Sequence, residues 1–374
     1  MRLRSAPLED WLRDYYFTAE IDISSSGVQS YSMGELRAMT GTGQDEIDAL
    51  VFDDGYSLGA PAVRSALAEL HGGVDPATVM TTCGSGEAIS LVMMALLRPG
   101  DEVVVVAPGY HLLVEYAVAL GCETKAWRLD AERGWQASLD ELAELVTGRT
   151  RAIIVNFPQN PTGATLSAEE MRAVLATAER VGAYVLWDSA FAALTYEDEP
   201  LPDVSACYER GISFGTFSKA FGLPGLRFGW CLAPPEVLED CMRIKDYTTL
   251  HVSPLVELLA LGVLRNSGAF LGPRLAQATT NREIVRKWAE SNRDLVSLTL
   301  PAGGVAAFPE LVGLPDTWDF CEALFQRHGV LVVPGGCFDE PAHIRLGFGG
   351  AADQLEEGLD RLTSALLAWP GRRG

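Results

Sequence analysis

Three apolar runs of strand length lead into residues with polar or reactive side chains. Residues 103–106 are four consecutive valines, and residues 152–155 and 183–187 are also strongly apolar. Such runs are typical of strands that are buried on both faces of a parallel sheet. Open α/β sheets bind ligands at the carboxyl ends of their strands. The pattern therefore predicts an α/β fold in which one edge of the sheet carries the functional residues.

The residues that follow these runs, together with a fourth segment, are suited to a single site. Tyr110 follows the first run, Asn160 follows the second, and Asp188 ends the third. Lys219 lies in the fourth segment, residues 213–227. Because four strand ends converge on one edge of such a sheet, we expect these four side chains to meet.

Lys219 is one of only four lysines in the chain, and its neighbours are Phe, Ala and Gly. Apolar surroundings disfavour the charged form of an amine, and a neutral lysine amine is a nucleophile for carbonyl groups. Arg227 follows eight residues later, while Thr216 and Ser218 place hydroxyl groups beside the amine. The segment predicts a Schiff-base lysine next to an anion site. A helix-end lysine and a surface arginine are the alternative.

A glycine-containing turn, Cys-Gly-Ser-Gly-Glu, precedes an apolar helix that is expected to continue to Leu97. Glycines at a strand-to-helix turn let backbone N–H groups approach a phosphate. The third glycine of a dinucleotide fingerprint is missing, and the sequence contains no Walker-type loop. Ser85 and Gly86 are therefore expected to bind a phosphate on the same cofactor as Lys219 and Arg227.

Composition limits the partners that the chain can have. A formal net charge of −21 repels nucleic acid and anionic membranes. No run approaches the roughly 20 apolar residues that span a bilayer, and the first residues lack the apolar run of a signal peptide. Seven cysteines without a Cys-x-x-Cys argue against a disulfide framework or a zinc site. We expect a cytoplasmic enzyme without a metal.

Residues 213–227 and the Asn-Pro-Thr-Gly sequence at 160–163 resemble the fold-type-I pyridoxal-phosphate enzymes, the aspartate aminotransferase superfamily. The resemblance implies a large domain with a mixed, mostly parallel sheet between helices, and a smaller α+β domain. It implies pyridoxal 5′-phosphate as the cofactor, held by Lys219 as a Schiff base. The implied cofactor-binding residues are Ser85, Gly86, Tyr110, Asn160, Asp188, Thr216, Ser218, Lys219 and Arg227. Among them, Tyr110 would stack on the pyridine ring and Asp188 would pair with the ring nitrogen. The implied catalytic residues are Lys219, Asp188 and Tyr110.

The resemblance also implies how the substrate is bound and how the chain is divided. Arg345, with Asn160, would bind the substrate carboxylate, because a guanidinium matches a carboxylate with two parallel hydrogen bonds. Ser25 and Gly27 lie in the N-terminal turn that lines the same pocket in the superfamily. The implied units are an arm at 1–40 that contributes to the small domain and the active site, a large domain at 41–270 and a small domain at 271–374. A homodimer with active sites near its interface is expected.

Two positions depart from the superfamily pattern. Asp54 stands where relatives have a tyrosine that reaches the partner's phosphate group, with Tyr56 two residues later. Whether Asp54 or Tyr56 replaces that contact is open. Phe191 stands where many relatives have a tyrosine that bonds the phenolic oxygen of the cofactor. Its loss hints at chemistry other than ordinary transamination.

Longer stretches between about residue 6 and residue 365 resemble the capreomycidine synthases. These stretches are residues 6–13, 22–28, 155–158, 186–188, 190–191 and 329–335. The resemblance implies the cyclisation of (2S,3S)-3-hydroxyarginine to capreomycidine, an amino acid used in antibiotic biosynthesis. The steps would be Cα deprotonation, β-elimination of the 3-hydroxyl group and addition of the substrate's own guanidine. An ordinary aminotransferase, an oxygen-using arginine oxidase and a binding protein without activity are the alternatives.

Such a reaction also needs protein groups that hold the guanidinium of the substrate and that assist the departure of hydroxide. Side chains of suitable type are Asp22, Asp53, Asp54, Glu87 and His251. The sequence alone does not choose among these residues, nor does it identify the group that assists the departure of hydroxide.

Overall fold

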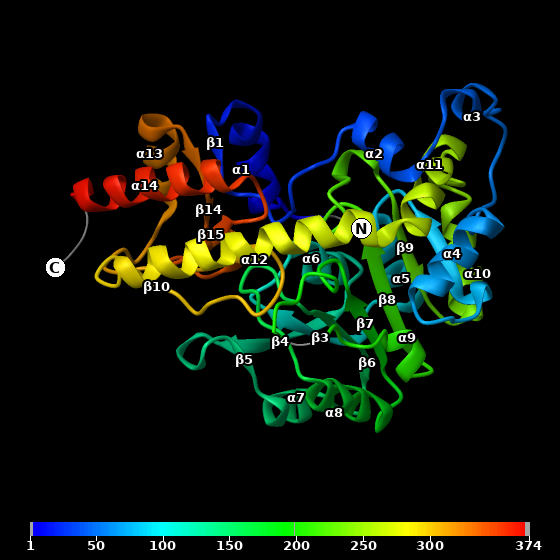
Figure 1. Ribbon diagram of the computed structural model, residues 1–374. Coiled ribbons are helices and arrows are strands. Elements are labelled where there is room, and N and C mark those ends of the chain that lie inside the picture. The colour runs from blue at the N-terminus through cyan, green and yellow to red at the C-terminus, as the bar shows by residue number, and fades with distance from the viewer. Residues whose placement is uncertain (1–2, 198, 371–374) are drawn as a thin grey trace.

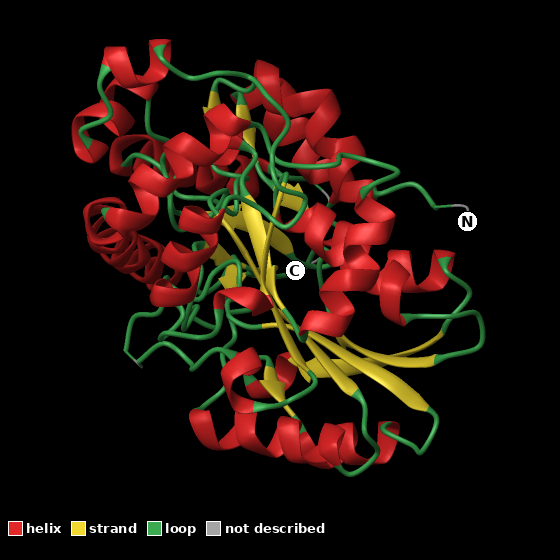
Figure 2. Ribbon diagram, turned by 90° about the vertical axis from the view of Figure 1, so that its right-hand side faces the viewer, coloured by secondary structure: helices red, strands yellow, loops and turns green. Residues whose placement is uncertain are grey.

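An eight-stranded sheet forms the centre of the larger part of the molecule, and helices cover both of its faces, as Figure 2 shows. The computed structural model describes residues 3–197 and 199–370. The strands lie in the order β2-β9-β8-β7-β6-β3-β4-β5. Their bounds are β2 Val79–Thr82, β3 Glu102–Ala107, β4 Glu123–Asp130, β5 Gln136–Ala137, β6 Thr150–Asn156, β7 Tyr184–Asp188, β8 Gly211–Thr216 and β9 Gly229–Leu232. Strands β4, β3, β6, β7 and β8 are parallel, whereas β9 and β5 run antiparallel to their neighbours.

The consecutive valines of β3 alternate between two apolar clusters on opposite faces of the sheet. Val103 and Val105 belong to a cluster with α5, α6 and α10, while Val104 and Val106 belong to a cluster with α7 and α8. The bounds of these helices, with the short α9, are α5 Ser85–Leu96, α6 His111–Ala119, α7 Leu139–Leu145, α8 Ala168–Glu179, α9 Val204–Cys207 and α10 Pro235–Lys245. Successive side chains of a strand point to opposite faces, so a strand covered on both sides has to be apolar throughout.

Further helices lie beside the sheet and connect it to the smaller part of the molecule. Their bounds are α2 Met33–Thr40, α3 Gln44–Asp48, α4 Pro61–Leu70, α11 Pro254–Arg265 and α12 Ser267–Ser291. The long helix α12, yellow in Figure 1, runs from the large part towards the small one. Among the described residues no single helix is long and apolar enough to cross a membrane. In the described part of the chain, the pair α11 and α12 is long and apolar enough when taken together, but the two helices are bent by 71°.

The two ends of the chain build the smaller part together, where blue and red elements lie side by side in Figure 1. Strand β1 pairs in parallel with β13, and β14 and β11 flank β15. The bounds of its elements are α1 Pro7–Tyr15, β1 Ile21–Asp22, β10 Val296–Ser297, β11 Ala306–Ala307, β12 Glu310–Leu311, α13 Trp318–His328, β13 Val330–Leu331, β14 Val333–Pro334, β15 Ile344–Gly347 and α14 Ala352–Ala368. The N-terminal arm is therefore attached to the C-terminal layer by a strand pair.

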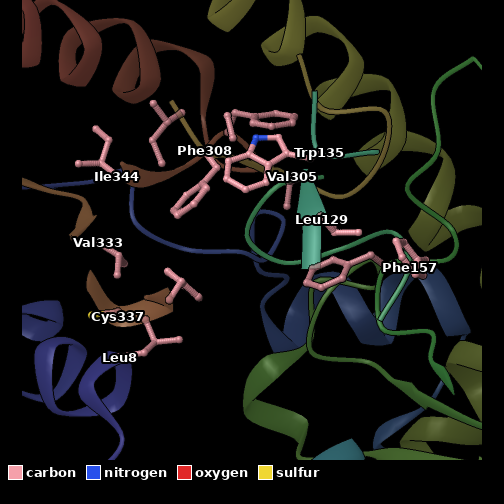
Figure 3. Packing of buried hydrophobic residues seen from close by; sticks show 14 of the residues in the cluster. Leu8, Leu129, Trp135, Phe157, Val305, Phe308, Val333, Cys337 and Ile344 are labelled. Carbon is pink, nitrogen blue, oxygen red and sulfur yellow. The ribbon is translucent and has the colours of Figure 1, made fainter. Parts of the chain in front are cut away.

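One apolar cluster continues from the sheet into the smaller part (Figure 3). Leu129 and Phe157 belong to the large sheet and its loops, whereas Phe308 and Ile344 belong to the smaller part. Trp135 lies between them, with its ring centroid 5.6 Å from that of Phe308. Burial of such large apolar side chains stabilises the contact between the two parts. It holds β15 in a defined position relative to the carboxyl edge of the sheet.

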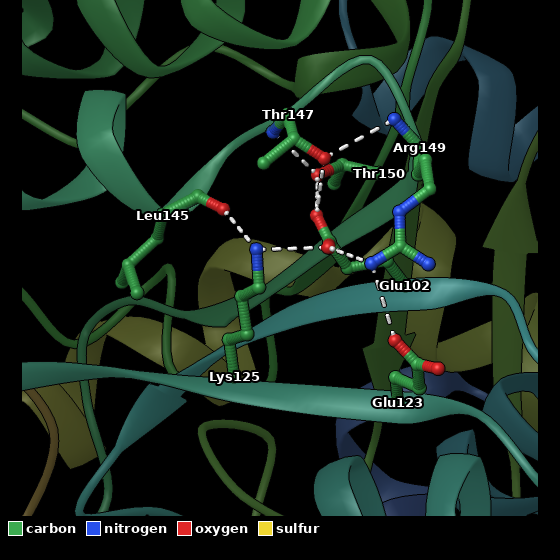
Figure 4. Close-up of polar contacts among 7 residues, drawn as sticks. All are labelled: Glu102, Glu123, Lys125, Leu145, Thr147, Arg149 and Thr150. Atoms are coloured by element: carbon green, nitrogen blue, oxygen red, sulfur yellow. Dashed lines mark hydrogen bonds and ion pairs between the residues drawn. The ribbon is translucent and has the colours of Figure 1, made fainter.

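Glu102 is a fully buried carboxylate at the amino end of β3, on the edge of the sheet opposite to the predicted site (Figure 4). Its oxygens accept hydrogen bonds from Lys125 at 2.8 Å and from Thr150 at 2.6 Å and Thr147 at 2.9 Å. Burial opposes its ionisation, but the bonds from Lys125, Thr150 and Thr147 outweigh that effect and hold its pKa at about 2. The cluster therefore ties β3, β4 and β6 together as long as the carboxylate is ionised.

Replacing Glu102 by glutamine is expected to lower the free energy of unfolding by about 3 kcal/mol, because it leaves the Lys125 amine beside a neutral group. The folded-state pKa of about 2 lies below the ordinary value of 4.5. The stabilising effect is therefore complete above pH 4.5 and disappears as the pH falls towards 2. Urea unfolding midpoints of both proteins at pH 7 and near pH 3 measure this difference.

Glu123→Gln is the matched control for the Glu102 variant. Glu123 lies 3.3 Å from Arg149 of the same cluster, but its side chain is 61% exposed. Exposed ion pairs contribute little, so we expect a change of about 0.5 kcal/mol or less. Equal effects of the two substitutions would contradict the proposed role of the buried carboxylate.

Candidate active site

The carboxyl ends of β3, β6, β7 and β8 open into one cavity between the sheet and the smaller part of the molecule. The residues that the sequence predicted for the cofactor all line this cavity: Ser85, Gly86, Tyr110, Asn160, Asp188, Thr216, Ser218, Lys219 and Arg227. Arg345 of β15 also lines it. The fold thus brings together side chains that lie far apart in the sequence.

One end of the cavity is built for an anion. Helix α5 begins at Ser85, and the preceding Gly84 has a φ of 91° and provides no side-chain cap. This positive φ strains any residue with a Cβ atom, and a Cβ atom on Gly84 would also displace the Arg227 guanidinium, because it would lie 2.6 Å from one of its nitrogens. Arg227 also donates to the Ser218 hydroxyl at 3.3 Å, and the Thr216 hydroxyl lies 3.0 Å from that of Ser218. A helix N-terminus, a guanidinium and two hydroxyl groups together suit a phosphate.

Lys219 follows β8 and directs its amine into the cavity. Its Nζ donates a hydrogen bond to the Ser26 hydroxyl at 2.8 Å and lies 5.7 Å from the centre of the Phe191 ring. Burial, followed by the positive charge of Arg345, lowers the pKa of the Lys219 amine from 10.5 to about 8. A considerable fraction of this amine is therefore neutral and nucleophilic at mildly alkaline pH.

Asp188 is the last residue of β7, and its side chain is almost completely buried. Its Oδ1 accepts the Ala190 N–H at 3.1 Å, and its backbone carbonyl accepts the Asn156 amide at 2.9 Å. Burial raises the pKa of the Asp188 carboxyl to about 6. A buried carboxylate requires a partner, and a protonated ring nitrogen in the cavity would supply one.

Arg345 is only 2% exposed, although it carries a charge. Its two terminal nitrogens donate to the Ser24 carbonyl at 2.9 Å and to Asn160 Oδ1 at 3.3 Å. The buried Nε has no hydrogen-bond partner among the described residues. Burial lowers the pKa of Arg345 to about 10, but this value is still high enough to keep the side chain charged at neutral pH. A carboxylate from a substrate would compensate this charge.

The N-terminal turn contributes to the cavity through one residue that the sequence did not single out. Ser26 lines the cavity, whereas Ser25 and Gly27 are not among its lining residues. The Ser25 hydroxyl instead accepts the Gly27 N–H at 3.1 Å. A Cβ atom on Gly347 would lie 1.7 Å from the Ser25 carbonyl oxygen, so the turn packs directly on β15. That packing turns the Ser26 side chain towards Lys219.

None of the acidic residues nominated by type for the guanidino group lines the cavity. Asp22 accepts the Ser24 N–H and hydroxyl at 2.8 and 2.6 Å. The side chain of Asp54 is 99% exposed and lies 3.4 Å from His251. Glu87 accepts the Cys83 N–H and the Thr249 hydroxyl. The carboxylates of Asp22 and Glu87 are therefore bound by groups of the fold itself, whereas the carboxylate of Asp54 lies in solvent.

Glu9 is an acidic residue of the cavity that no pattern in the sequence indicates. It lies on α1, lines the cavity and accepts the Tyr110 hydroxyl group at 3.3 Å. In the sequence it is one of two acidic residues in the first turn of a helix, where negative charge merely stabilises the helix end. Its spacing therefore carries no signal of function. Only the packing of α1 against the smaller part reveals its position.

Residues 54–362 match the family described as aminotransferase class I and II. The chain belongs to this family. The match covers most of the large part of the molecule and most of the small one. The described residues contain no group of three or more His, Cys, Asp or Glu that could hold a metal ion.

Several known proteins resemble this chain both in sequence and in fold. The chain is 44% identical to a capreomycidine synthase of Streptomyces vinaceus over 97% of this chain and 94% of that protein. A solved PLP-dependent cyclase, OrfR, in complex with Au, is 40% identical, with 98% of each chain covered and a TM-score of 0.93. A PLP-dependent aminotransferase from Streptococcus suis 89-1591 is 31% identical, with the same coverage and TM-score. The predicted fold class and the resemblance to capreomycidine synthases are confirmed.

Pyridoxal 5′-phosphate is the cofactor of this family member, as the sequence predicted. The cavity fits this group, because it combines a phosphate-binding end without a Cβ atom at Gly84 with the Lys219 amine and the buried Asp188 carboxylate. These features match the phosphate, the aldehyde and the pyridine nitrogen of the cofactor.

Proposed function

We propose that this enzyme cyclises (2S,3S)-3-hydroxyarginine to capreomycidine as a step in antibiotic biosynthesis. The observation that carries this proposal is the 44% identity, over 97% of the chain, to a capreomycidine synthase. The reaction removes the Cα proton, eliminates the 3-hydroxyl group and adds the guanidine nitrogen to Cβ. The Cα proton and the 3-hydroxyl group leave together as water. The guanidine nitrogen loses one proton as it bonds to Cβ, and one proton is returned to Cα, so the product is lighter than the substrate by one water and no second substrate is consumed.

The cofactor would be held by the residues that line one side of the cavity. When bound, pyridoxal phosphate supplies an electron sink that stabilises negative charge at the substrate Cα. The proposed roles are Lys219 as its covalent anchor, Ser85, Gly86, Thr216, Ser218 and Arg227 as phosphate ligands, Tyr110 as the stacking ring, Asn160 at the phenolic oxygen and Asp188 at the pyridine nitrogen.

Lys219 is also proposed to move the Cα proton. A base works best when its pKa lies near the working pH, and the Lys219 pKa of about 8 satisfies this condition. The Ser26 hydroxyl, 2.8 Å from Nζ, orients the amine. The same amine can return the proton to Cα after the ring has closed, so one group performs both transfers.

Arg345 is proposed to bind the substrate carboxylate together with Asn160. The free Nε of Arg345 and its contact with Asn160 Oδ1 support this role. Ser25 and Gly27 are proposed to shape the carboxylate pocket through their backbone, next to Ser24, whose carbonyl holds Arg345.

Ring closure requires the guanidine, rather than water, to reach Cβ. The cavity has apolar walls at Leu8, Leu12, Ile89 and Phe191. These walls exclude water and favour a folded substrate side chain, so that proximity replaces a second reactant. Phe191 cannot donate the hydrogen bond that a tyrosine would give there, which supports a reaction other than ordinary transamination.

Anaerobic incubation of the holoenzyme with 3-hydroxyarginine, without a keto acid, tests the proposal. We expect a product lighter by one water in mass spectrometry and cyclic by NMR. Unchanged substrate that reacts only after a keto acid is added would instead make this enzyme an aminotransferase. A requirement for oxygen would indicate an arginine oxidase, and no reaction with any of these would indicate a protein without activity.

We propose a homodimer with its interface near the active site. Exposed apolar side chains gather on two neighbouring loops: Val51, Phe52, Tyr56, Tyr247 and Leu250. The two loops are in contact, because Asp54 lies 3.4 Å from His251. Exposed apolar patches of this kind mark interaction surfaces. Sedimentation should give a mass near twice 40.3 kDa, and full activity at a monomeric mass would contradict the proposal.

We further propose that the enzyme works in the cytoplasm on a small amino acid with a guanidino group. The seven cysteines are all unpaired, which suits a reducing compartment. Detection of the chain in the soluble cell fraction together with a cytoplasmic marker enzyme would test this location, and recovery with secreted proteins would contradict it.

A further inference from the structure

Glu9 is the only acidic side chain besides Asp188 that lines the active-site cavity within the described residues. Leu8, Glu9 and Leu12 of α1 all line the cavity, and Leu12 lies four positions after Leu8 and three after Glu9, so it is a neighbour of both on the helix surface. The two leucines form apolar walls of the cavity. Glu9 therefore presents a negative charge within a largely apolar part of the site.

Glu9 forms no direct ion pair among the described residues, and its charge acts on Lys219, Arg345 and His111 only at longer range. Its Oε1 accepts the Tyr110 hydroxyl at 3.3 Å, while Oε2 has no hydrogen bond or ion pair within the described part of the chain. Burial, followed by the charge of Glu9, raises the Tyr110 pKa well above its usual value, so Tyr110 remains a neutral donor. A half-buried carboxylate whose only direct hydrogen bond comes from a neutral donor still has acceptor positions to fill, and a cation in the cavity would fill them.

We infer that Glu9 binds the guanidinium group of the substrate and sets the preference of the enzyme for a cationic side chain. This inference rests on the proposed function. A guanidinium donates two parallel hydrogen bonds to a carboxylate. Each carboxylate oxygen has two acceptor positions, so the contact from Tyr110 to Oε1 can persist while the substrate binds.

The fold holds Glu9 and Arg345 on the same rigid unit. Trp11 of α1 is 3% exposed and donates to the Val332 carbonyl at 2.9 Å. The next residue, Val333, pairs with Arg345 across β14 and β15. The separation between the proposed carboxylate site and the proposed guanidinium site is thus fixed by backbone structure. Such a fixed separation selects substrates by length as well as by charge.

Equilibrium binding of L-arginine and L-citrulline to the holoenzyme tests the role of Glu9 without any turnover. Citrulline has the same length but an uncharged urea group in place of the guanidinium. Because a charge-assisted contact is lost, we expect the wild type to bind arginine about 10- to 100-fold more tightly than citrulline. In Glu9→Gln this ratio should fall to about one to three. Isothermal titration calorimetry measures both dissociation constants.

Asp10→Asn is the matched control, because it removes the same charge from the adjacent position of the same helix. Asp10 bonds with Ser5 and Arg13 and does not line the cavity. The arginine-to-citrulline ratio should remain within about twofold of the wild type. Glu9→Asp retains the charge, so it should retain a preference for arginine even if Glu9→Gln is poorly folded.

A merely structural role for Glu9 gives a different result. Tyr110→Phe removes the contact with Glu9 but leaves the carboxylate, and it should weaken both ligands while preserving their ratio. If Glu9→Gln also weakens both ligands equally, Glu9 only positions Tyr110 and the inference is overturned. A wild type that prefers arginine but does not cyclise 3-hydroxyarginine would overturn the proposed function and support the role of Glu9.

Discussion

Replacing Lys219 by alanine is expected to lower the turnover of 3-hydroxyarginine by at least about 10⁴-fold, because the substitution removes both the covalent anchor and the base. The amine is the only lysine nitrogen that reaches the cavity among the described residues. Burial and the charge of Arg345 give this amine a pKa of about 8, and alanine at this position provides no group that could act as a base in its place. Single-turnover kinetics and the visible absorbance of the bound cofactor measure the loss.

Two further variants show whether the amine itself is required. Lys219→Arg retains a positive charge but lacks a nucleophilic amine, so it should be as inactive as Lys219→Ala. Lys287→Ala removes a lysine whose side chain is 68% exposed, and it should remain within about twofold of wild-type activity. Activity of Lys219→Ala within tenfold of the wild type would rule out the proposed role.

Replacing Asp188 by asparagine is expected to lower turnover by about 10³-fold while the cofactor still binds. Asparagine has the same shape and can still accept the Ala190 N–H through its Oδ1, which lies 3.1 Å away. It has no negative charge, however, to compensate a protonated pyridine nitrogen. The electron sink at Cα is therefore weakened. Steady-state rates per cofactor-loaded molecule measure the effect.

Asp203→Asn separates the loss of a buried charge from the loss of catalysis. Asp203 is a buried carboxylate that pairs with His71 at 2.8 Å and does not line the active-site cavity. Its replacement should lower stability but leave the rate per loaded molecule within about threefold of the wild type. If Asp188→Asn reduces the rate no more than Asp203→Asn does, the proposed contact with the pyridine nitrogen is wrong.

Much of the large part of the molecule could be predicted from the sequence, because local and long-range preferences agree there. Four consecutive valines have few stable environments other than a strand covered on both faces, and residues 103–106 lie within such a strand. Parallel strands place their carboxyl ends on one edge. Tyr110, Asn160, Asp188 and Lys219 were therefore expected to lie together, and all four line one cavity.

The acidic lining of the cavity could not be predicted in the same way. Asp22, Asp53, Asp54, Glu87 and His251 had suitable side chains, but none of them lines the cavity. The direction of a polar side chain in a loop depends on the packing of the backbone around it, which residue type does not reveal. Asp22 illustrates this point, since its carboxylate is bound by the Ser24 N–H and hydroxyl.

The sequence by itself determined the sheet, the family and the set of residues that line the cavity around Lys219, because each of these depends on short segments with a strong local pattern. Only the tertiary structure decided that Ser26, rather than Ser25 or Gly27, reaches Lys219, and that Glu9 enters the cavity. Both residues belong to the N-terminal arm, which pairs with β13 more than 300 residues away. Contacts between such distant segments depend on how complete surfaces pack, and no local pattern in the arm encodes them.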